Sequence, residues 1–222
     1  MTNNVIKANL WPFPKNINNV LIRDNISFNK IYINLNSYKK DIKLDFHNPL
    51  RDFKEYMKGL YKNIIINESE NKNNNFTNSI NLHMNYDSKL KLEEYKIVYK
   101  DKDSTITIHS NNHIGIGYGL ITLSQLLTLN NNSLNLPNFK FIHDSPNTEI
   151  REVLLDVSRT YYPVKDIYEF IRINGYSKIN SINFHFIDSQ SFPLALGPIT
   201  KILSCTEGEG IFEGLTGAFI DP

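Results

Sequence analysis

The chain has 222 residues, 41% hydrophobic and 21% charged, so it is long enough to bury a substantial core and has the balance of a globular protein. Its 24 basic and 23 acidic side chains leave a formal net charge of +1, and no footprint for nucleic acid stands out. One cysteine, Cys205, excludes an internal disulfide and a multi-cysteine metal site. No apolar run is long enough for us to expect a membrane span.

Residues 1–145 are predicted to form an α+β domain built from an antiparallel sheet and two helices. Asn-rich stretches predict loops between segments of alternating polarity, since Asn favours turns. Hydrophobic residues at helical spacing predict helices over 49–66 and 115–129. The adjacent Glu93 and Glu94 are expected to be solvated. The predicted strands are 30–35, 79–86, 94–100 and 104–110.

A β-α-β unit is predicted from about residue 150. The continuous apolar run VLLDV (153–157) is typical of a strand buried on both faces. A helix is expected over 163–178 and a second strand, parallel to the first, over 179–187. In parallel α/β folds the chemistry lies beyond the carboxyl ends of the strands. Arg159 and Asp188 stand at those two ends and are therefore candidate functional residues.

The segment LLDVSRTYYPVKDIYEFIRINGYSKINSINFHFIDSQSFPL resembles the opening of the catalytic barrel of β-N-acetylhexosaminidases, glycoside hydrolase family 20. Upstream, LWPFP (10–14) is similar to the Trp-Pro strand that opens the family's N-terminal domain. IGIGYGLITLSQLL is similar to that domain's closing helix, and IHDSPNTEIRE to its linker. The resemblance implies three parts: a zincin-like N-terminal hexosaminidase domain over 1–145, the first two strands of a (β/α)8 TIM barrel over 146–194, and a divergent tail over 195–222.

The implied reaction is hydrolysis of terminal non-reducing N-acetylhexosamine residues of glycoconjugates, with neither cofactor nor metal. In such retaining, substrate-assisted catalysis the sugar's 2-acetamido carbonyl is the nucleophile. A neighbouring Asp-Glu pair orients the acetamide and protonates the leaving oxygen. Arg159 matches the family's sugar-binding arginine, whose planar fork of donors suits two vicinal hydroxyls. Asp188 matches a carboxylate of the same pocket, and His185 the second His of the family's His-Trp-His.

Each of these residues also has a structural interpretation. An arginine after a strand is usually a solvated charge, and an Asp there usually caps a turn. A lone histidine in an apolar strand is more often a hydrogen-bonded core residue, so for His185 both interpretations stand. Asp156 could be a structural salt-bridge partner. His109 and His113 have no third ligand beside them, which argues against a metal site.

The chain departs from the family pattern at several positions. Thr160 replaces a His, Asn183 and Phe184 replace His-Trp, and Ser189 replaces a second Asp. The family's His-x-Gly-Gly-Asp-Glu string is absent, and a full barrel needs about 250 residues. We therefore expect a truncated, inactive chain with no catalytic residue of its own. The alternative is a non-catalytic truncated paralogue that acts as an interaction partner or has no stable function.

The resemblance also implies a lysosomal or secreted location, although no signal peptide is visible. Expected partners are N-acetylhexosamine-terminated glycoconjugates or a second hexosaminidase subunit in a dimer, with no nucleic acid. Glycosylation sequons, which chance alone could produce in so Asn-rich a chain, are expected in surface turns at Asn25, Asn67, Asn75 and Asn131.

Overall fold

The computed structural model describes residues 10–18, 21–34, 47–61, 63–69, 78–130 and 133–186. The chain divides into two compact units, Met1–Asn147 and Thr148–Pro222. None of the helices in the described ranges is both long and apolar enough to span a membrane.

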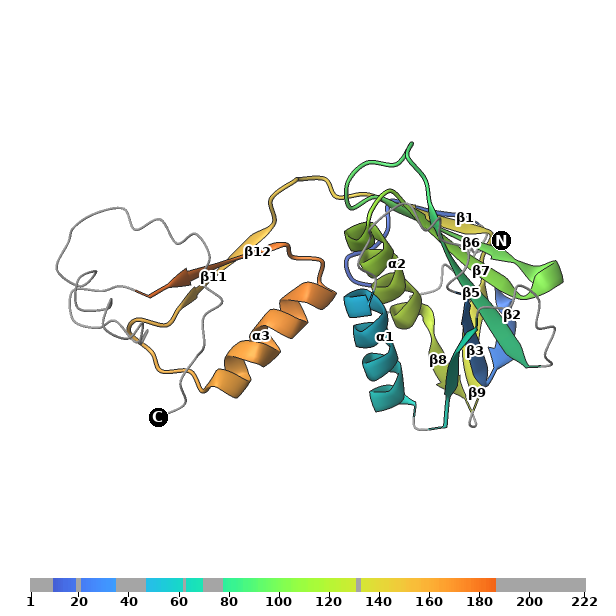
Figure 1. The fold of residues 1–222 in the computed structure, drawn as a ribbon, viewed down its shortest axis with the longest axis horizontal. Coiled ribbons are helices and arrows are strands. Elements are labelled where there is room, and N and C mark those ends of the chain that lie inside the picture. Colours follow the sequence, from blue (N-terminus) through green and yellow to red (C-terminus); the bar gives the residue numbers. More distant parts are fainter. Residues whose placement is uncertain are drawn as a thin grey trace. The chain divides into compact units, whose positions relative to one another are not determined.

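The first unit contains a seven-stranded sheet and a small three-stranded sheet (Figure 1). The seven strands, in spatial order, are β1 (Asn16–Asn18), β10 (Phe141–Asp144), β6 (Tyr95–Lys100), β7 (Thr105–Ser110), β5 (Ser79–Tyr86), β3 (Lys30–Asn34) and β4 (Ile65–Ser69). A short 3-10 helix, η2 (Asp101–Asp103), turns the chain from β6 into β7. The small sheet has the order β2 (Leu21–Phe28), β9 (Ser133–Asn138) and β8 (Thr128–Asn130).

The prediction of an antiparallel sheet is wrong, because the large sheet is mixed. Strand β3 pairs in parallel with both β4 and β5, and β5 pairs in parallel with β7. Only the part from β1 to β7 is antiparallel. Helix α1 (His47–Leu60) lies in the connection from β3 to β4, and so long a crossover returns the chain in its original direction. Alternating polarity does not reveal direction, so the sequence pattern could not show this.

Three predicted elements end or lie elsewhere than expected. The helix predicted over 49–66 stops at Leu60, and the β-branched residues after it enter β4. Helix α2 (His113–Leu126) starts with the Asn112 side chain accepting from the Gly115 amide at 2.8 Å and ends before β8. No strand forms over 10–14, where Trp11 and Phe13 are exposed; β1 begins at Asn16.

Helices α1 and α2 lie on one face of the large sheet, where the main core forms (Figure 1). Inward side chains of the strands, such as Leu82 and Ile108, and of the helices, such as Met57 and Leu120, are buried. A polar network crosses this core: the Tyr95 hydroxyl lies 2.6 Å from Thr122 Oγ1 and donates to Asp144 Oδ2 at 3.0 Å. Burial, with the nearby Asp144 charge, raises the pKa of Tyr95 well above its usual value, so this hydroxyl stays protonated.

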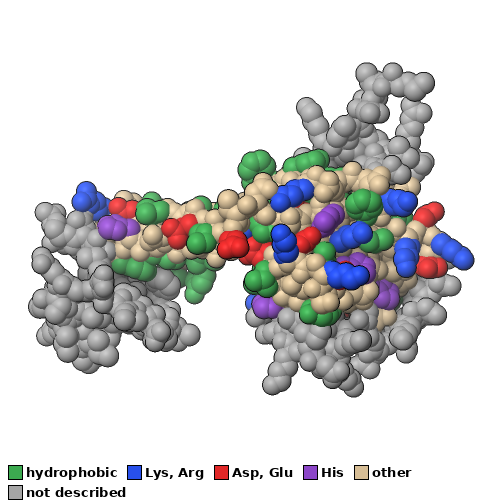
Figure 2. Space-filling view, turned by 90° about the horizontal axis from the view of Figure 1, so that it is seen from above, with side chains coloured by type: hydrophobic (Ala, Val, Ile, Leu, Met, Phe, Trp, Pro, Cys, Tyr) green, Lys and Arg blue, Asp and Glu red, His purple; other side chains and the backbone are tan. Residues whose placement is uncertain are grey.

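The second unit consists of β11 (Glu152–Asp156), α3 (Val164–Tyr176) and β12 (Ser181–His185). The two strands pair in parallel, which confirms the predicted β-α-β arrangement. The expectation that residues 153–157 are buried on both faces is wrong. The sheet of this unit has two strands, and the one described helix, α3, leaves part of its surface exposed. Leu154 is 63% exposed, and hydrophobic side chains lie on the surface of this unit (Figure 2).

The prediction that the four glycosylation sequons lie in turns is wrong for two of them. Asn25 lies in β2 and Asn67 in β4. Asn75 and Asn131 lie outside the described residues.

Candidate functional site

Asp156 closes a tight turn at the carboxyl end of β11. Its Oδ1 atom accepts from the Ser158 amide at 2.9 Å, the Ser158 hydroxyl at 2.8 Å and the Arg159 amide at 3.3 Å. The hydrogen bond from the Ser158 hydroxyl is the main reason that the pKa of Asp156 is lowered, despite an opposing desolvation effect. The ionised carboxylate therefore fixes the backbone that carries Arg159. Asp156 thus caps this turn.

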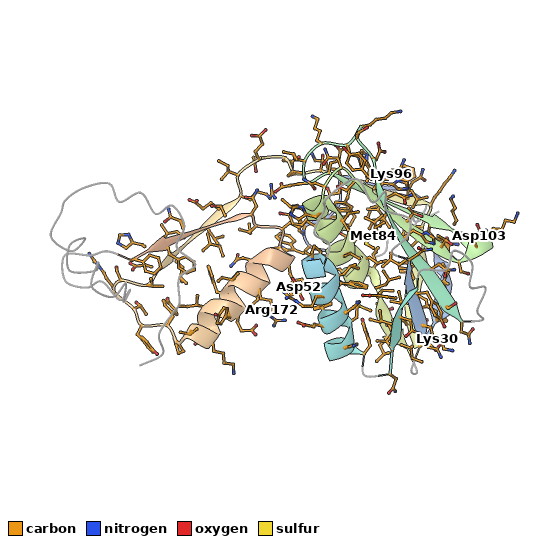
Figure 3. All side chains as sticks on the ribbon, in the orientation of Figure 1. Lys30, Asp52, Met84, Lys96, Asp103 and Arg172 are labelled. Atoms are coloured by element: carbon orange, nitrogen blue, oxygen red, sulfur yellow. The ribbon has the colours of Figure 1, made fainter. Side chains whose placement is uncertain are left out.

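The two residues between Asp156 and Arg159 pack into the interior and so hold the turn in place. Val157 and Ser158 are buried, whereas Arg159 is exposed. Helix α3 follows immediately and buries Ile167. On the exposed surface of this helix, Arg172, labelled in Figure 3, pairs with Glu169 Oε2 at 2.6 Å. The local sequence thus places a charged residue at the strand end next to two buried residues.

His185 reaches the same edge from the neighbouring strand. It is the register partner of Asp156, and its carbonyl accepts from the Val157 amide at 3.1 Å. The side chain of His185 is exposed, which does not fit a buried, hydrogen-bonded core histidine. Two of the three predicted site residues thus lie at the carboxyl-end edge of adjacent parallel strands: His185 at the end of β12, and Arg159 in the turn that follows β11. Asp188 lies outside the described residues.

The opposite end of the two strands is tied by Arg151 and Asn180, which sequence reasoning missed. Arg151 donates through Nε to the Lys178 carbonyl and through a terminal nitrogen to the Thr148 carbonyl, each at 2.8 Å. Asn180 accepts from the Arg151 amide at 2.9 Å and donates to the Glu149 carbonyl at 2.7 Å. An arginine directly before a strand, with an Asn before the next strand, is the signal that could have indicated it. Hydrogen bonds therefore fix the backbone at both ends of the strand pair, through Arg151 and Asn180 at one end and Asp156 at the other.

The described residues of the first unit offer no comparable site. Within the described part of the chain, no three or more His, Cys, Asp or Glu side chains group as metal ligands, and His109 and His113 belong to different elements, β7 and α2. The expected solvation of Glu94 is wrong: its side chain is only 13% exposed, and Oε1 lies 2.6 Å from His143 Nε2. This pair ties the start of β6 to β10 and is structural.

Comparison with known proteins places both units in one family. Residues 36–145 match the model of glycosyl hydrolase family 20, domain 2, and residues 149–207 match that of its catalytic domain. A similar relative is the β-hexosaminidase subunit B1 of Dictyostelium discoideum, 36% identical over 146 residues, which are 61% of this chain and 26% of that protein. The human β-hexosaminidase subunit beta is 34% identical over 101 residues, 46% of this chain and 18% of that protein.

Solved structures show the same fold. The family 20 exo-β-N-acetylglucosaminidase of Vibrio harveyi gives a TM-score of 0.65 at 19% identity, covering 84% of this chain and 27% of that one. The Flavobacterium johnsoniae chitobiase gives 0.63 at 24% identity, with 89% and 30% covered. The chain thus spans about a quarter of the length of such relatives. The two domain models cover most of its residues in the order expected of one protein, and the chain belongs to glycosyl hydrolase family 20.

Proposed function

We propose that the β11–α3–β12 unit is the first β-α-β unit of a (β/α)8 barrel, within a part of the catalytic domain that spans 146–194. We propose in the same way that residues 1–145 form the family's zincin-like accessory domain, followed by a divergent tail over 195–222. The parallel pairing of β11 with β12 and the short loops around α3 support the barrel assignment. The mixed sheet with two helices on one face supports the accessory domain.

The function that this arrangement supports best is hydrolysis of terminal non-reducing N-acetylhexosamine residues from glycoconjugates, carried out by the protein of which these units form part. The observation that carries the proposal is the Asp156 turn, which fixes the backbone of Arg159 at the strand edge that His185 also reaches. A guanidinium held there offers fixed paired donors to sugar hydroxyls. Asp188, three residues beyond His185, is proposed to complete this subsite.

The subsite binds and orients but supplies no acid for the leaving group. The sequence contains no adjacent Asp-Glu pair. In the substrate-assisted reaction the acetamide of the sugar attacks the anomeric carbon, and a separate carboxylic acid must protonate the departing oxygen. Residues 1–222 by themselves are therefore expected to bind N-acetylhexosamine weakly without turnover. A lysosomal or secreted setting, in which such glycoconjugates occur, is part of the same proposal.

A second candidate is a non-catalytic interaction protein, for example a partner of another hexosaminidase subunit. The observation in its favour is the group of exposed apolar side chains on the second unit, among them Leu154 at 63% and Ile173 at 59% exposure. Exposed apolar patches commonly mark surfaces that another chain covers. This candidate predicts association without any dependence on Arg159.

The two candidates are separated by sugar binding and by association. N-acetylglucosamine binding to purified 1–222 is measured by saturation-transfer NMR for the unmodified chain, Arg159→Lys and Arg159→Ala. Both variants should lose binding, because Lys keeps the charge but not the planar fork. Arg172→Lys on α3 is the matched control and should bind normally. Binding that is unchanged in Arg159→Ala contradicts the subsite. Release of an aryl group from an aryl N-acetylglucosaminide by 1–222, lost in Arg159→Ala, contradicts the expected lack of turnover.

Association is measured by light scattering after mixing with an intact hexosaminidase. A complex that is lost in Leu154→Ser but kept in Arg159→Ala favours the interaction protein. A monomeric chain whose sugar binding depends on Arg159 favours the catalytic-domain fragment.

A further inference from the structure

The face of the large sheet turned away from α1 and α2 is basic. Side chains alternate along each strand, and the register aligns the outward positions across all seven strands. Within the described strands, no outward position of this sheet is Asp or Glu. Glu68 of β4 pairs with Lys54 of α1 and so belongs to the other face. The outward cationic and histidine residues, which we call the basic sheet face, are Lys30, His83, Lys96, Lys100, His109 and His143.

Lys96 lies at the centre of this face. It is the register partner of His109 on β7 and of His143 on β10. Because neighbouring strands are about 4.8 Å apart, these three side chains fall within roughly 10 Å of one another. The Lys96 ammonium lies 5.1 Å from the centre of the Phe141 ring, which keeps it over the sheet. Lys30 and Lys96 are both marked on sheet strands in Figure 3, and Lys, Arg and His side chains are interspersed on the visible surface of the first unit in Figure 2.

Burial and neighbouring lysines lower the pKa values of two histidines on this face. Burial first, and then the positive charge of Lys100, lower the pKa of His83. Burial likewise lowers the pKa of His109, where Asp87 opposes the effect and Lys96 and Lys100 add to it. Among the described residues, the carboxylates stand at the margins of the face: Asp87 follows the end of β5, Asp101 and Asp103 lie in η2 directly after Lys100, and Glu94, before β6, is engaged with His143. Within the described strands, the centre of the face therefore carries the positive charge of Lys96 with no carboxylate at an outward position, although the whole chain is nearly neutral.

We propose that the basic sheet face binds an anionic carbohydrate chain that carries sulfate or carboxylate groups. A ligand that complements the lysines of the basic sheet face must carry negative charge. The remaining outward side chains include many amides and hydroxyls, such as Asn81, Asn85 and Thr105, which can both donate to and accept from sugar hydroxyls. This site lies on the first unit and uses neither Arg159 nor His185, so it goes beyond the proposed hydrolysis.

Two other anionic partners fit the face less well. An acidic peptide gains affinity by adding a strand to a sheet edge, but the backbone groups of β5, β6 and β7 are already paired on both sides. A membrane surface favours apolar side chains that enter the lipid, whereas the central outward positions here are mostly polar. A hydroxyl-rich polyanion needs neither a free edge nor an apolar anchor.

The test is binding of a fluorescently labelled chondroitin sulfate oligosaccharide to the full chain, followed by anisotropy at low salt. The double variant Lys96→Gln/Lys100→Gln should weaken binding roughly five- to thirtyfold, since two solvent-exposed ion pairs are lost. The control Arg51→Gln/Lys58→Gln removes the same charge from exposed positions on α1, on the other side of the sheet, and should change binding less than about twofold. A neutral dextran oligosaccharide should not bind.

Three results would overturn the proposal. The first is no binding of the sulfated chain at low salt. The second is an equal loss in the two double variants, which would mean that overall charge rather than this face decides binding. The third is equally tight binding of oligoglutamate or of anionic vesicles with the same dependence on Lys96 and Lys100, which would assign the face to a peptide or a membrane. None of these results depends on hydrolysis or on Arg159.

Discussion

Two glycines of α2 provide a sharp test of how the first unit is packed. Both lie inside the helix, but a methyl group at each would meet different surroundings. A Cβ atom at Gly119 would lie 2.6 Å from Ile108 Cγ2 and 3.4 Å from Tyr95 Cδ2. A Cβ atom at Gly117 would lie 3.5 Å from its nearest neighbour, Pro49 Cβ, an ordinary contact. Gly117 and Gly119 therefore differ in how tightly their surroundings are packed, although both lie in the interior of the same helix.

The expected free energies follow from this difference. Replacement of Gly by Ala favours a helix by about 1 kcal/mol at either position. At Gly119 the added methyl also overpacks Ile108, which is fully buried on β7, and such overpacking costs about 1–3 kcal/mol. Gly117→Ala should thus raise the free energy of unfolding by about 1 kcal/mol. Gly119→Ala should leave that free energy unchanged or lower it by up to about 2 kcal/mol.

Native-state hydrogen exchange of the α2 amides in increasing urea measures this free energy for the first unit without a contribution from the second. The difference between the two variants removes the shared helix propensity and leaves the packing cost. If Gly119→Ala proves as stable as Gly117→Ala, then α2 does not approach β7 as closely as described, and the reasoning fails.

Two further predictions concern charged groups. Burial alone would raise the pKa of Glu94, but hydrogen bonds from the Lys91 amide and His143 lower it overall below 4.5. The contribution of Glu94 to stability is therefore present above about pH 4.5 and is lost as the pH falls through the lowered pKa. Glu94→Gln should lower the free energy of unfolding by about 1 kcal/mol at pH 7 and by progressively less in acid, as measured by urea unfolding. A constant cost at every pH would contradict this. In the second unit, Asp156→Ala should speed hydrogen exchange of the Arg159 amide, and Asp156→Asn should do so less; NMR exchange with no change in either variant would rule out the turn.

The sequence by itself determined most of the local structure. Strands β5, β6 and β7 lie at or within one residue of their predicted bounds, because strict alternation over six to eight residues allows little else. The β-α-β order around α3 was predictable for the same reason: a continuous apolar run, a helix with Pro at its start and a second strand leave parallel pairing as the natural solution. The motif around Arg159 also identified the family that the domain models show.

Only the tertiary structure decided how these pieces are connected and which side chains share a surface. Direction within the large sheet depends on the crossover through α1, and polarity along a strand is the same whether its neighbour runs parallel or antiparallel. The cap formed by Asp156 and the anchoring of Arg151 depend on carbonyls and amides that only the folded turn brings within reach. The basic sheet face is likewise invisible in a chain with a net charge of +1, because strand register, rather than composition, places Lys96 beside two histidines far from it in the sequence.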